Sequence, residues 1–294
     1  MKIIVVSDFD TRLDKYLSMH TDFSRELITK MIEENLVLVN GSLKKASYKV
    51  HEKDEITYEE NFKTVSDIVP VEMDLDIIFE DEDIIVVNKP SGVVVHPGSG
   101  NFDNTLVNGL MNYTNSLSNI NGEARVGIVH RIDKDTSGLM LVAKSNKAHE
   151  ILAEDFKNHN VKRTYIALLC GVLPYEKATI DAPIKRDAKN FNKMGVFEDG
   201  KKAITHLRVI KRFKKYTLVS LNLETGRTHQ IRVHMNYIGF PIYNDPVYNK
   251  MTCTDFGQFL HSKEVDFVHP ITKEKMHFEV DLPEEFKKII DSLE

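Results

Sequence analysis

A polar loop near the middle of the chain, residues 130–138, carries the groups best suited to chemistry. Asp133 and Asp135 stand there beside Arg131 and His130. A neighbouring cation favours the ionised form of a carboxylate, and an ionised carboxylate on a rigid loop can act as a nucleophile or a general base. The same residue types also suit a hydrogen-bonded turn whose polar side chains bond their own backbone. Residue types and spacing leave both interpretations open.

A second cluster, residues 223–234, contributes arginines and histidines. Arg227 and Arg232 can each bind a phosphate or a carboxylate, although Arg227 can equally be a surface charge. Arg232 stands between two apolar residues and is expected to point inward. The end of this cluster, from His229 to His234, is predicted to be a strand, which places these two histidines on opposite faces and argues against a shared zinc ion.

Apolar strands separated by short turns are expected to position both clusters. From Leu75 onward they are predicted at 84–87, 92–95, 127–129, 139–143, 164–169, 203–211, 217–224, 231–234 and 275–280. Helices are predicted at 105–111 and 147–157. Many strands with few helices indicate an α+β domain, residues 75–294, built on a large, mainly antiparallel sheet.

A smaller α/β unit is predicted over residues 12–58. Its expected elements are helices at 12–17 and 24–32 and strands at 36–39, 48–50 and 54–58. Ser24 is a good N-cap for the second helix, and Asn40-Gly41 is a strong signal for a two-residue hairpin turn. Residues 59–74 lose periodicity and are expected to form a linker.

The composition bounds the class of protein. The 294 residues are enough for about two domains, and 41% apolar with 28% charged residues is typical of a globular chain. The only two cysteines, Cys170 and Cys253, exclude a disulfide framework. No segment reaches the ~18–20 apolar residues of a membrane span, and the apolar run at the N-terminus is too short for a signal peptide. A soluble, cytoplasmic protein is therefore expected.

The net charge of −5 is unevenly spread along the chain. Residues 1–60 carry −3, residues 61–126 carry −7 and residues 127–294 carry +5. Because a partner senses the local potential, the basic C-terminal part can bind nucleic acid within an acidic chain. Charge alone does not distinguish this from an ordinary solvated surface.

Four motifs in this order resemble those of the RluA-type family of RNA pseudouridine synthases. They are residues 88–90 with 95–98, residues 127–138, residues 162–165 and residues 225–234, and residues 12–58 resemble an S4 RNA-binding domain. Together the matches span nearly the whole chain. The departures are small: Ile132 stands where the family usually has Leu, and Asn244 and Asn249 stand where Gly is commoner. Asn tolerates left-handed backbone angles, so the last two put little in doubt.

The resemblance implies roles for individual residues. Asp133 matches the catalytic aspartate that attacks the target uridine, and Tyr165 matches the tyrosine that packs on the base and assists proton removal. Arg232 matches the basic residue paired with that aspartate, and Arg131 matches the arginine that enters the space left by the flipped nucleotide. Leu260 matches an apolar residue of the uracil pocket. Further candidates for substrate contact are His130, Lys89, Arg227 and His229, and candidates for RNA contact in the S4 unit are Arg12, Lys15, Arg25 and Lys30.

The expected partner is RNA, with ribosomal RNA of the large subunit favoured over transfer RNA. No cofactor or metal is expected, because the isomerisation involves neither redox chemistry nor net hydrolysis. No membrane partner is expected either, and the protein is expected to be a monomer. Two other classes of function stay open on the residues alone. One is a glycosidase or nucleoside hydrolase that uses Asp133 and Asp135 as its paired carboxylates. The other is a non-catalytic RNA-binding factor in ribosome assembly. Whether Asp133 attacks the ribose C1′ or the uracil ring also stays open.

Overall fold

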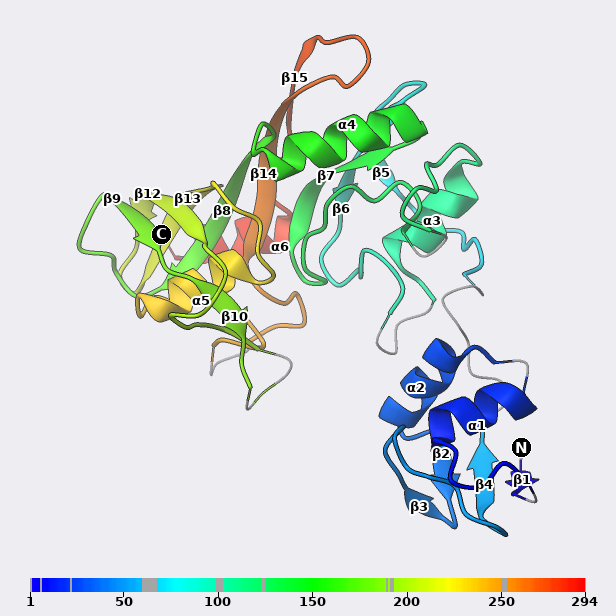
Figure 1. Cartoon of the computed structure of the whole chain (residues 1–294). Helices are drawn as coiled ribbons and strands as arrows, with labels where there is room; N and C mark the ends of the chain where they lie inside the picture. Colours follow the sequence, from blue (N-terminus) through cyan, green and yellow to red (C-terminus); the bar gives the residue numbers. More distant parts are fainter. Residues whose placement is uncertain are drawn as a thin grey trace. The chain divides into compact units, whose positions relative to one another are not determined.

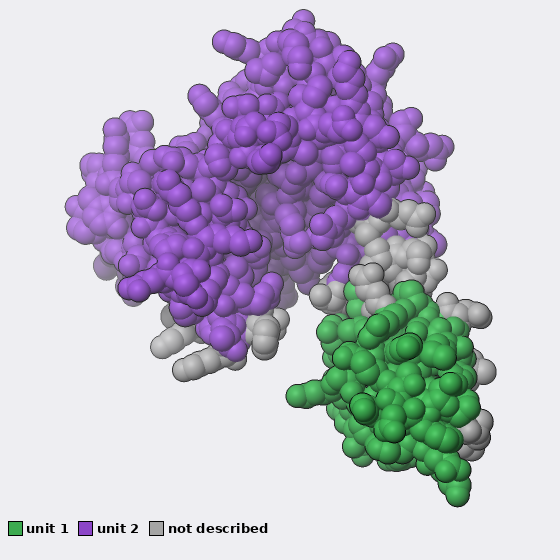
Figure 2. Space-filling view, in the orientation of Figure 1, with its two compact units in different colours: residues 1–67 green, residues 68–294 purple. Residues whose placement is uncertain are grey.

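The computed structural model describes residues 2–5, 7–21, 23–59, 68–98, 103–122, 125–188, 190, 193–249 and 253–293. The chain divides into two compact units, Met1–Asp67 and Ile68–Glu294, which are drawn in Figure 1 and coloured separately in Figure 2. None of the helices in the described ranges has the length and apolarity that crossing a bilayer requires.

Two helices pack on a small antiparallel sheet in the first unit. The helices are α1 (Leu13–His20) and α2 (Arg25–Glu33), and the strands are β1 (Lys2–Ile4), β2 (Val37–Val39), β3 (Ser42–Leu43) and β4 (Glu55–Tyr58). The strands pair in the order β1-β4-β2-β3. As predicted, the Ser24 side chain caps α2 by accepting the Leu27 N–H, and Asn40 and Gly41 take the positive φ angles of a hairpin turn. The strand predicted at 48–50 is wrong, since only an isolated bridge from Lys49 to Arg12 forms there.

A mixed sheet dominates the second unit. Its described strands are β5 (Asp76–Glu80), β6 (Ile84–Lys89), β7 (Ser137–Ala143), β8 (Lys162–Cys170), β9 (Lys177–Asp181), β12 (Ile204–Arg212), β13 (Tyr216–Leu223), β14 (Leu260–Val268) and β15 (Lys275–Glu279). They pair in the order β5-β6-β7-β14-β8-β13-β12-β9, with β15 on β14, and β7–β14 is the parallel pair. A separate pair is formed by β10 (Ile184–Arg186) and β11 (Met194–Val196). The predicted α+β class, with a mainly antiparallel sheet, is confirmed.

Helices cover both faces of this sheet. They are α3 (Leu106–Tyr113), α4 (Asn146–Lys157), α5 (Gln230–Tyr237) and α6 (Glu284–Ser292). In β6, Ile85 and Val87 pack in the cluster that includes α3 and α5, while Ile84 and Val86 pack on the opposite face in the cluster that includes α4. A strand buried on both faces is apolar at every position, which explains why this run was easy to predict.

Three predicted strands are absent from the described chain. The segment 231–234 belongs to helix α5. Its apolar residues alternate with polar ones, which is the pattern of a half-buried strand. In the structure residues 230–235 of the helix are all buried, so the polar residues do not form the exposed face from which a helix is recognised. Residues 92–95 form a turn and coil, and 127–129 makes only a single bridge, from Ile128 to Val142.

The segment at the start of the second unit packs on α3. The Asn108 side chain donates to the Val69 carbonyl at 2.8 Å, and the Val71 N–H donates to the Asn108 carbonyl at 3.1 Å. Residues 60–67 of the predicted linker 59–74 lie outside the described residues. The later part of that segment belongs with the second unit.

Candidate active site

The loop that carries Asp133 is held to the turn after β6 by buried polar contacts. Lys89 is fully buried, and its Nζ donates to the carbonyls of Pro90 at 2.7 Å, Val93 at 2.8 Å and Lys134 at 2.8 Å. Burial lowers the pKa of Lys89 to about 7, against the opposing effect of nearby carboxylates. All three donors of an ammonium group are used in these bonds. Lys89 therefore fixes the backbone of the loop and does not face the pocket as a substrate ligand.

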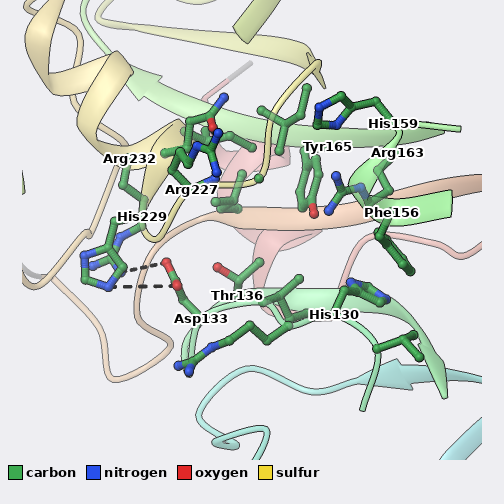
Figure 3. Close-up of a pocket in the computed structure, with 18 of the residues that line it drawn as sticks. His130, Asp133, Thr136, Phe156, His159, Arg163, Tyr165, Arg227, His229 and Arg232 are labelled. Carbon is green, nitrogen blue, oxygen red and sulfur yellow. Dashed lines mark hydrogen bonds and ion pairs between the residues drawn. The ribbon is translucent and has the colours of Figure 1, made fainter. Parts of the chain in front are cut away.

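Asp133 is paired with Arg232, which comes from α5. Arg232 Nη1 donates to Asp133 Oδ2 at 2.9 Å (Figure 3). Arg232 Nε and Nη2 donate to the two oxygens of Asp245 at 2.7 and 2.9 Å. The exposed fraction of the side chain is 4% for Arg232, 0% for Asp245 and 19% for Asp133. Asp245 also accepts the backbone N–H groups of Val247 and Tyr248. A bidentate arginine held by a buried carboxylate is rigid, so Arg232 presents its third contact to Asp133 in a fixed position.

The charges of this centre support one another. Burial acts to lower the pKa of Arg232, but the hydrogen bonds and charges of Asp245 and Asp133 raise it above its usual value. Burial likewise acts to raise the pKa of Asp245, and Arg232 holds it below its usual value. The centre is therefore a buried cation between two carboxylates, of which only Asp133 reaches the pocket.

His229 lies on the other side of Asp133, at the start of α5. Its backbone has a φ of 55°, and its Nε2 is 3.9 Å from Asp133 Oδ1. Its Nδ1 is 2.9 Å from the Tyr248 hydroxyl, which also accepts the Met194 N–H at 2.8 Å. With the hydroxyl hydrogen directed at Nδ1, neutral His229 carries its proton on Nε2, toward Asp133. Burial lowers the pKa of His229, which favours this neutral form.

A pocket of about 480 Å³ opens above these groups. Tyr165 of β8 and Leu260 of β14 are 4% and 3% exposed and line its wall, and Thr136 lines its floor near Asp133 (Figure 3). The surface of the second unit in Figure 2 is hollowed between the lobe that holds α5 and the lobe that holds α4. An aromatic ring, an apolar side chain and a carboxylate thus face one open pocket, which suits a flat polar ring such as a base.

The other predicted contact residues occupy different parts of this pocket. Arg131 is on the rim, with Nη1 3.3 Å from His96 Nε2, and Arg227 is exposed, with its Nε donating to the Lys202 carbonyl. His130 accepts the Leu141 N–H on Nε2 at 2.9 Å, and burial lowers its pKa well below the usual value. His130 is therefore a neutral wall group.

In the first unit, two of the four predicted RNA-binding cations meet at one carboxylate. Arg12 and Arg25 donate to Asp14 at 3.0 and 2.9 Å, and the side chains of both arginines remain about half exposed. Burial acts to raise the pKa of Asp14, and the hydrogen bonds of the two arginines hold it below its usual value. Lys15 and Lys30 are exposed. Asp14 therefore brings together two cations that are distant in sequence.

The carboxylates available to the pocket bear on the hydrolase alternative. Of the described residues that line it, Asp133 is the only carboxylate, and Asp135 packs instead against Gly257. An arrangement of two carboxylates across a sugar ring is therefore not present there. Within the described ranges, no group of three or more His, Cys, Asp or Glu side chains is placed to hold a metal ion.

Three residues of the site were missed from sequence. Asp245 and Tyr248 follow α5 in a turn. The sequence feature that could have indicated this turn is Asp245 itself, because an Asp side chain often accepts the backbone N–H groups two and three residues later, as it does here from Val247 and Tyr248. Arg163 of β8 also lines the pocket. In the sequence, only its position within the motif 162–165 pointed to it. The side-chain partners of Asp245 and Tyr248 in the site, Arg232 and His229, lie 13 and 19 positions away in the sequence.

Comparison with known proteins agrees with this geometry. The family model for RNA pseudouridylate synthase matches residues 83–237, and the model for the S4 domain matches residues 11–56. The uncharacterized RNA pseudouridine synthase YlyB of Bacillus subtilis is 49% identical over 96% of this chain and 94% of that protein. Ribosomal large subunit pseudouridine synthase D is 40% identical in Zymomonas mobilis, over 96% of this chain and 93% of that protein, and 37% identical in Pseudomonas aeruginosa, over 96% and 92%.

Solved structures share the fold of the second unit. The human RNA pseudouridylate synthase domain containing 1 has a TM-score of 0.60 and 24% identity, over 75% of this chain and 94% of that chain. The human RNA pseudouridylate synthase domain containing 4 has a TM-score of 0.58 and 21% identity, over 74% of this chain and 92% of that chain.

The sheet-dominated unit, the pocket in which Asp133 is the one carboxylate among the described lining residues, and the preceding S4 domain define an RNA-modifying isomerase. The chain belongs to the RNA pseudouridylate synthase family. Its reaction is the conversion of uridine in RNA to pseudouridine.

Proposed function

We propose that this chain converts specific uridines of large-subunit (23S) ribosomal RNA to pseudouridine, with Asp133 as the nucleophile. The observation that carries the proposal is the Asp133–Arg232–Asp245 centre at the pocket that Tyr165 lines, where Asp133 is the only carboxylate among the described lining residues. The choice of RNA rests on the relatives named ribosomal large subunit pseudouridine synthase D, which align over most of this chain.

The reaction needs one bond exchanged for another. The bond from N1 of the uracil to the ribose C1′ breaks, a bond from C5 to C1′ forms, C5 loses its proton and N1 gains one. No electron is transferred and no water is consumed. Arg232 positions Asp133 for attack, either on C1′ or on the ring, and the bond that Asp133 forms to the nucleotide is broken again when the product is released.

The remaining residues act on the position of the target base and on its proton. Tyr165 packs against the base and assists removal of the C5 proton, with Leu260 on the same wall. Arg131, at the rim, enters the space that the flipped nucleotide leaves, which offsets part of the energy of unstacking. The S4 domain adds contacts to phosphates through Arg12, Lys15, Arg25 and Lys30.

Mapping of pseudouridine in cells tests the proposal. Carbodiimide-stop sequencing of ribosomal and transfer RNA is compared between cells with the gene, cells without it, and cells that carry Asp133→Asn. We expect one or a few stops in 23S RNA to disappear without the gene and to return only with the wild-type chain. Loss of stops only in transfer RNA would move the substrate to that class, and unchanged stops in both would refute the proposal.

We further propose that the protein acts as a cytoplasmic monomer. The pocket draws all its described lining residues from one chain, so a second copy is not needed to complete it. Light scattering after size-exclusion chromatography is expected to give the mass of a single 33.7 kDa chain. A stable dimer would contradict this part.

A further inference from the structure

The pocket continues past Tyr165 to a second end that the proposed reaction does not use. This end is lined by Phe156 and Lys157 from the end of α4, by His159 from the following turn, and by Arg163 from β8. In Figure 3, Asp133 and His229 lie on one side of Tyr165, and Arg163, Phe156 and His159 lie on the other.

Arg163 is held in place without a partner for its charge. Its guanidinium carbon lies 5.2 Å from the centre of the Phe156 ring, a distance at which a cation is attracted to an aromatic face. Its Nε is buried and has no hydrogen-bond acceptor among the described residues, and no described carboxylate pairs with it. Arg232, by contrast, has two carboxylates. The buried Nε does not itself face the pocket, but the Arg163 side chain lines it, so the outer N–H groups of a guanidinium without a described counterion can receive an acceptor from outside the protein.

A second unpaired donor lies at the same end. His130 accepts on Nε2, so the proton of the neutral ring is on Nδ1, and that nitrogen is buried without a partner. The ring stacks on Phe156, with centroids 4.2 Å apart and planes 25° apart. Two donors that contact the same phenyl ring therefore lack acceptors.

The turn after α4 adds basic groups at a conformational cost. His159 adopts a φ of 62°, a left-handed angle at which glycine is less strained, so an imidazole is kept at the pocket. The carboxyl end of α4 opposes an anion with about half a negative charge, and Lys157 in its last turn is paired with Glu154 at 3.2 Å. The positive charge at this end that has no described carboxylate partner is therefore that of Arg163.

We infer that this end of the pocket binds a backbone phosphate of the RNA beside the flipped uridine, with Arg163 as its main ligand. Arg163 and Tyr165 are two residues apart on β8, so they share one face of the strand and lie roughly 7 Å apart. A nucleotide whose base packs on Tyr165 carries its phosphates at a comparable distance from the base. The planar guanidinium fork matches two oxygens of a phosphate, and one such contact gives register without reading sequence. The inference rests on the proposed RNA substrate.

A matched pair of substitutions on one strand tests the site. Arg163→Met removes the charge but keeps a side chain that can pack on Phe156. Lys162→Met makes the same change of charge at the neighbouring position, which is exposed and does not line the pocket. Full-length proteins are assayed by tritium release from 23S ribosomal RNA transcribed with 5-tritiated uridine, at several salt concentrations.

We expect Arg163→Met to lower kcat/KM by about ten-fold or more, mainly through KM, as for loss of a charge-assisted hydrogen bond. The dependence of log kcat/KM on log salt should become shallower by about 0.7–0.9, the contribution of one phosphate contact. Lys162→Met should leave both quantities within about two-fold of wild type.

Two further measurements keep the outcomes separate. Arg163→Lys retains the charge without the fork and should give an intermediate KM, and thermal unfolding identifies a variant that fails to fold. Equal salt slopes for wild type and a folded Arg163→Met would overturn the phosphate site. A wild-type protein that releases no tritium from this RNA would instead overturn the proposed substrate. In that case, the salt dependence of RNA affinity, compared between wild type and Arg163→Met, would still test the phosphate site.

Discussion

Replacing Arg232 by Met would test whether the Asp133–Arg232–Asp245 centre is needed both for the stability of the fold and for turnover. The substitution removes three hydrogen bonds, one to Asp133 and two to Asp245. Asp245 is 0% exposed and keeps only its two backbone N–H donors, so its charge is left buried without a counterion. Removing one partner of a buried ion pair costs about 3–5 kcal/mol, and we expect a loss of that size in the free energy of unfolding at pH 8.

The loss should depend on pH in a direction set by Asp245. In the wild type, Arg232 holds the pKa of Asp245 below its usual value, so the unfolded chain binds more protons and stability increases as pH rises through the acid range. In the variant, burial acts without the cation and raises the pKa of Asp245 above its unfolded value. The folded chain then binds more protons, and stability decreases as pH rises above about 4.

Urea unfolding of both proteins at pH 5, 6, 7 and 8 measures this effect. The difference between wild type and Arg232→Met should be smaller at pH 5 than at pH 8, by up to about 1.4 kcal/mol for each unit by which the pKa of Asp245 changes. The double variant Arg232→Met with Asp245→Asn serves as the control, since it has no buried carboxylate at this position and should lack the extra pH dependence. A penalty that is the same at every pH would refute the reasoning.

The activity of Arg232→Met should fall as well. The substitution removes the hydrogen bond that holds Asp133 in position at the pocket, so turnover should decrease wherever the variant stays folded. Tritium release from RNA measures this loss, and full activity would remove Arg232 from the catalytic centre.

Three further outcomes are expected. Asp133→Asn should reduce turnover to below about a tenth of wild type, one decade being ~1.4 kcal/mol of barrier, with RNA affinity nearly unchanged; higher residual turnover in the tritium-release assay would argue against a nucleophilic carboxylate. Lys89→Met should lower the free energy of unfolding by about 3 kcal/mol, because three carbonyls lose their hydrogen bonds to the buried Lys89 at about 1 kcal/mol each, and a change below about 1 kcal/mol in urea unfolding would contradict its role in fixing the loop. Deletion of residues 1–67, which leaves Val69 and Val71 on α3, should give a folded second unit whose RNA binding depends less steeply on salt; equal salt slopes and affinities for both chains would mean that the S4 domain does not contact that RNA.

Local signals in the sequence determined much of the fold. Ser24 predicts the start of α2 because its side chain satisfies an N–H of the first turn, whatever lies around it. Asn40-Gly41 predicts its hairpin because both residues tolerate positive φ. The fully apolar run of β6 predicts a strand covered on both faces. Each of these signals acts within a few residues, so no tertiary contact was needed to read it.

The helix α5 was assigned wrongly for a physical reason. Its apolar side chains alternate with Gln230, Arg232 and His234, and the sequence favours a strand with one polar face. In the fold these polar groups are buried and bonded to Thr205, Asp245 and the Ala182 carbonyl. Hydrophobic periodicity assumes that polar residues face water, and it fails where distant partners satisfy them inside the protein.

The sequence by itself determined which residue types are available for chemistry, and the motifs around Asp133, Tyr165 and Arg232 marked where to look. Only the tertiary structure decided their partners. Arg232 is 99 positions from Asp133 and 13 from Asp245, and Lys89 is 45 positions from the carbonyl that it fixes. The strength of such contacts depends on burial and on distances of about 3 Å, which are set when the sheet and its covering helices pack together. The spacing of residues along the chain does not reveal these contacts.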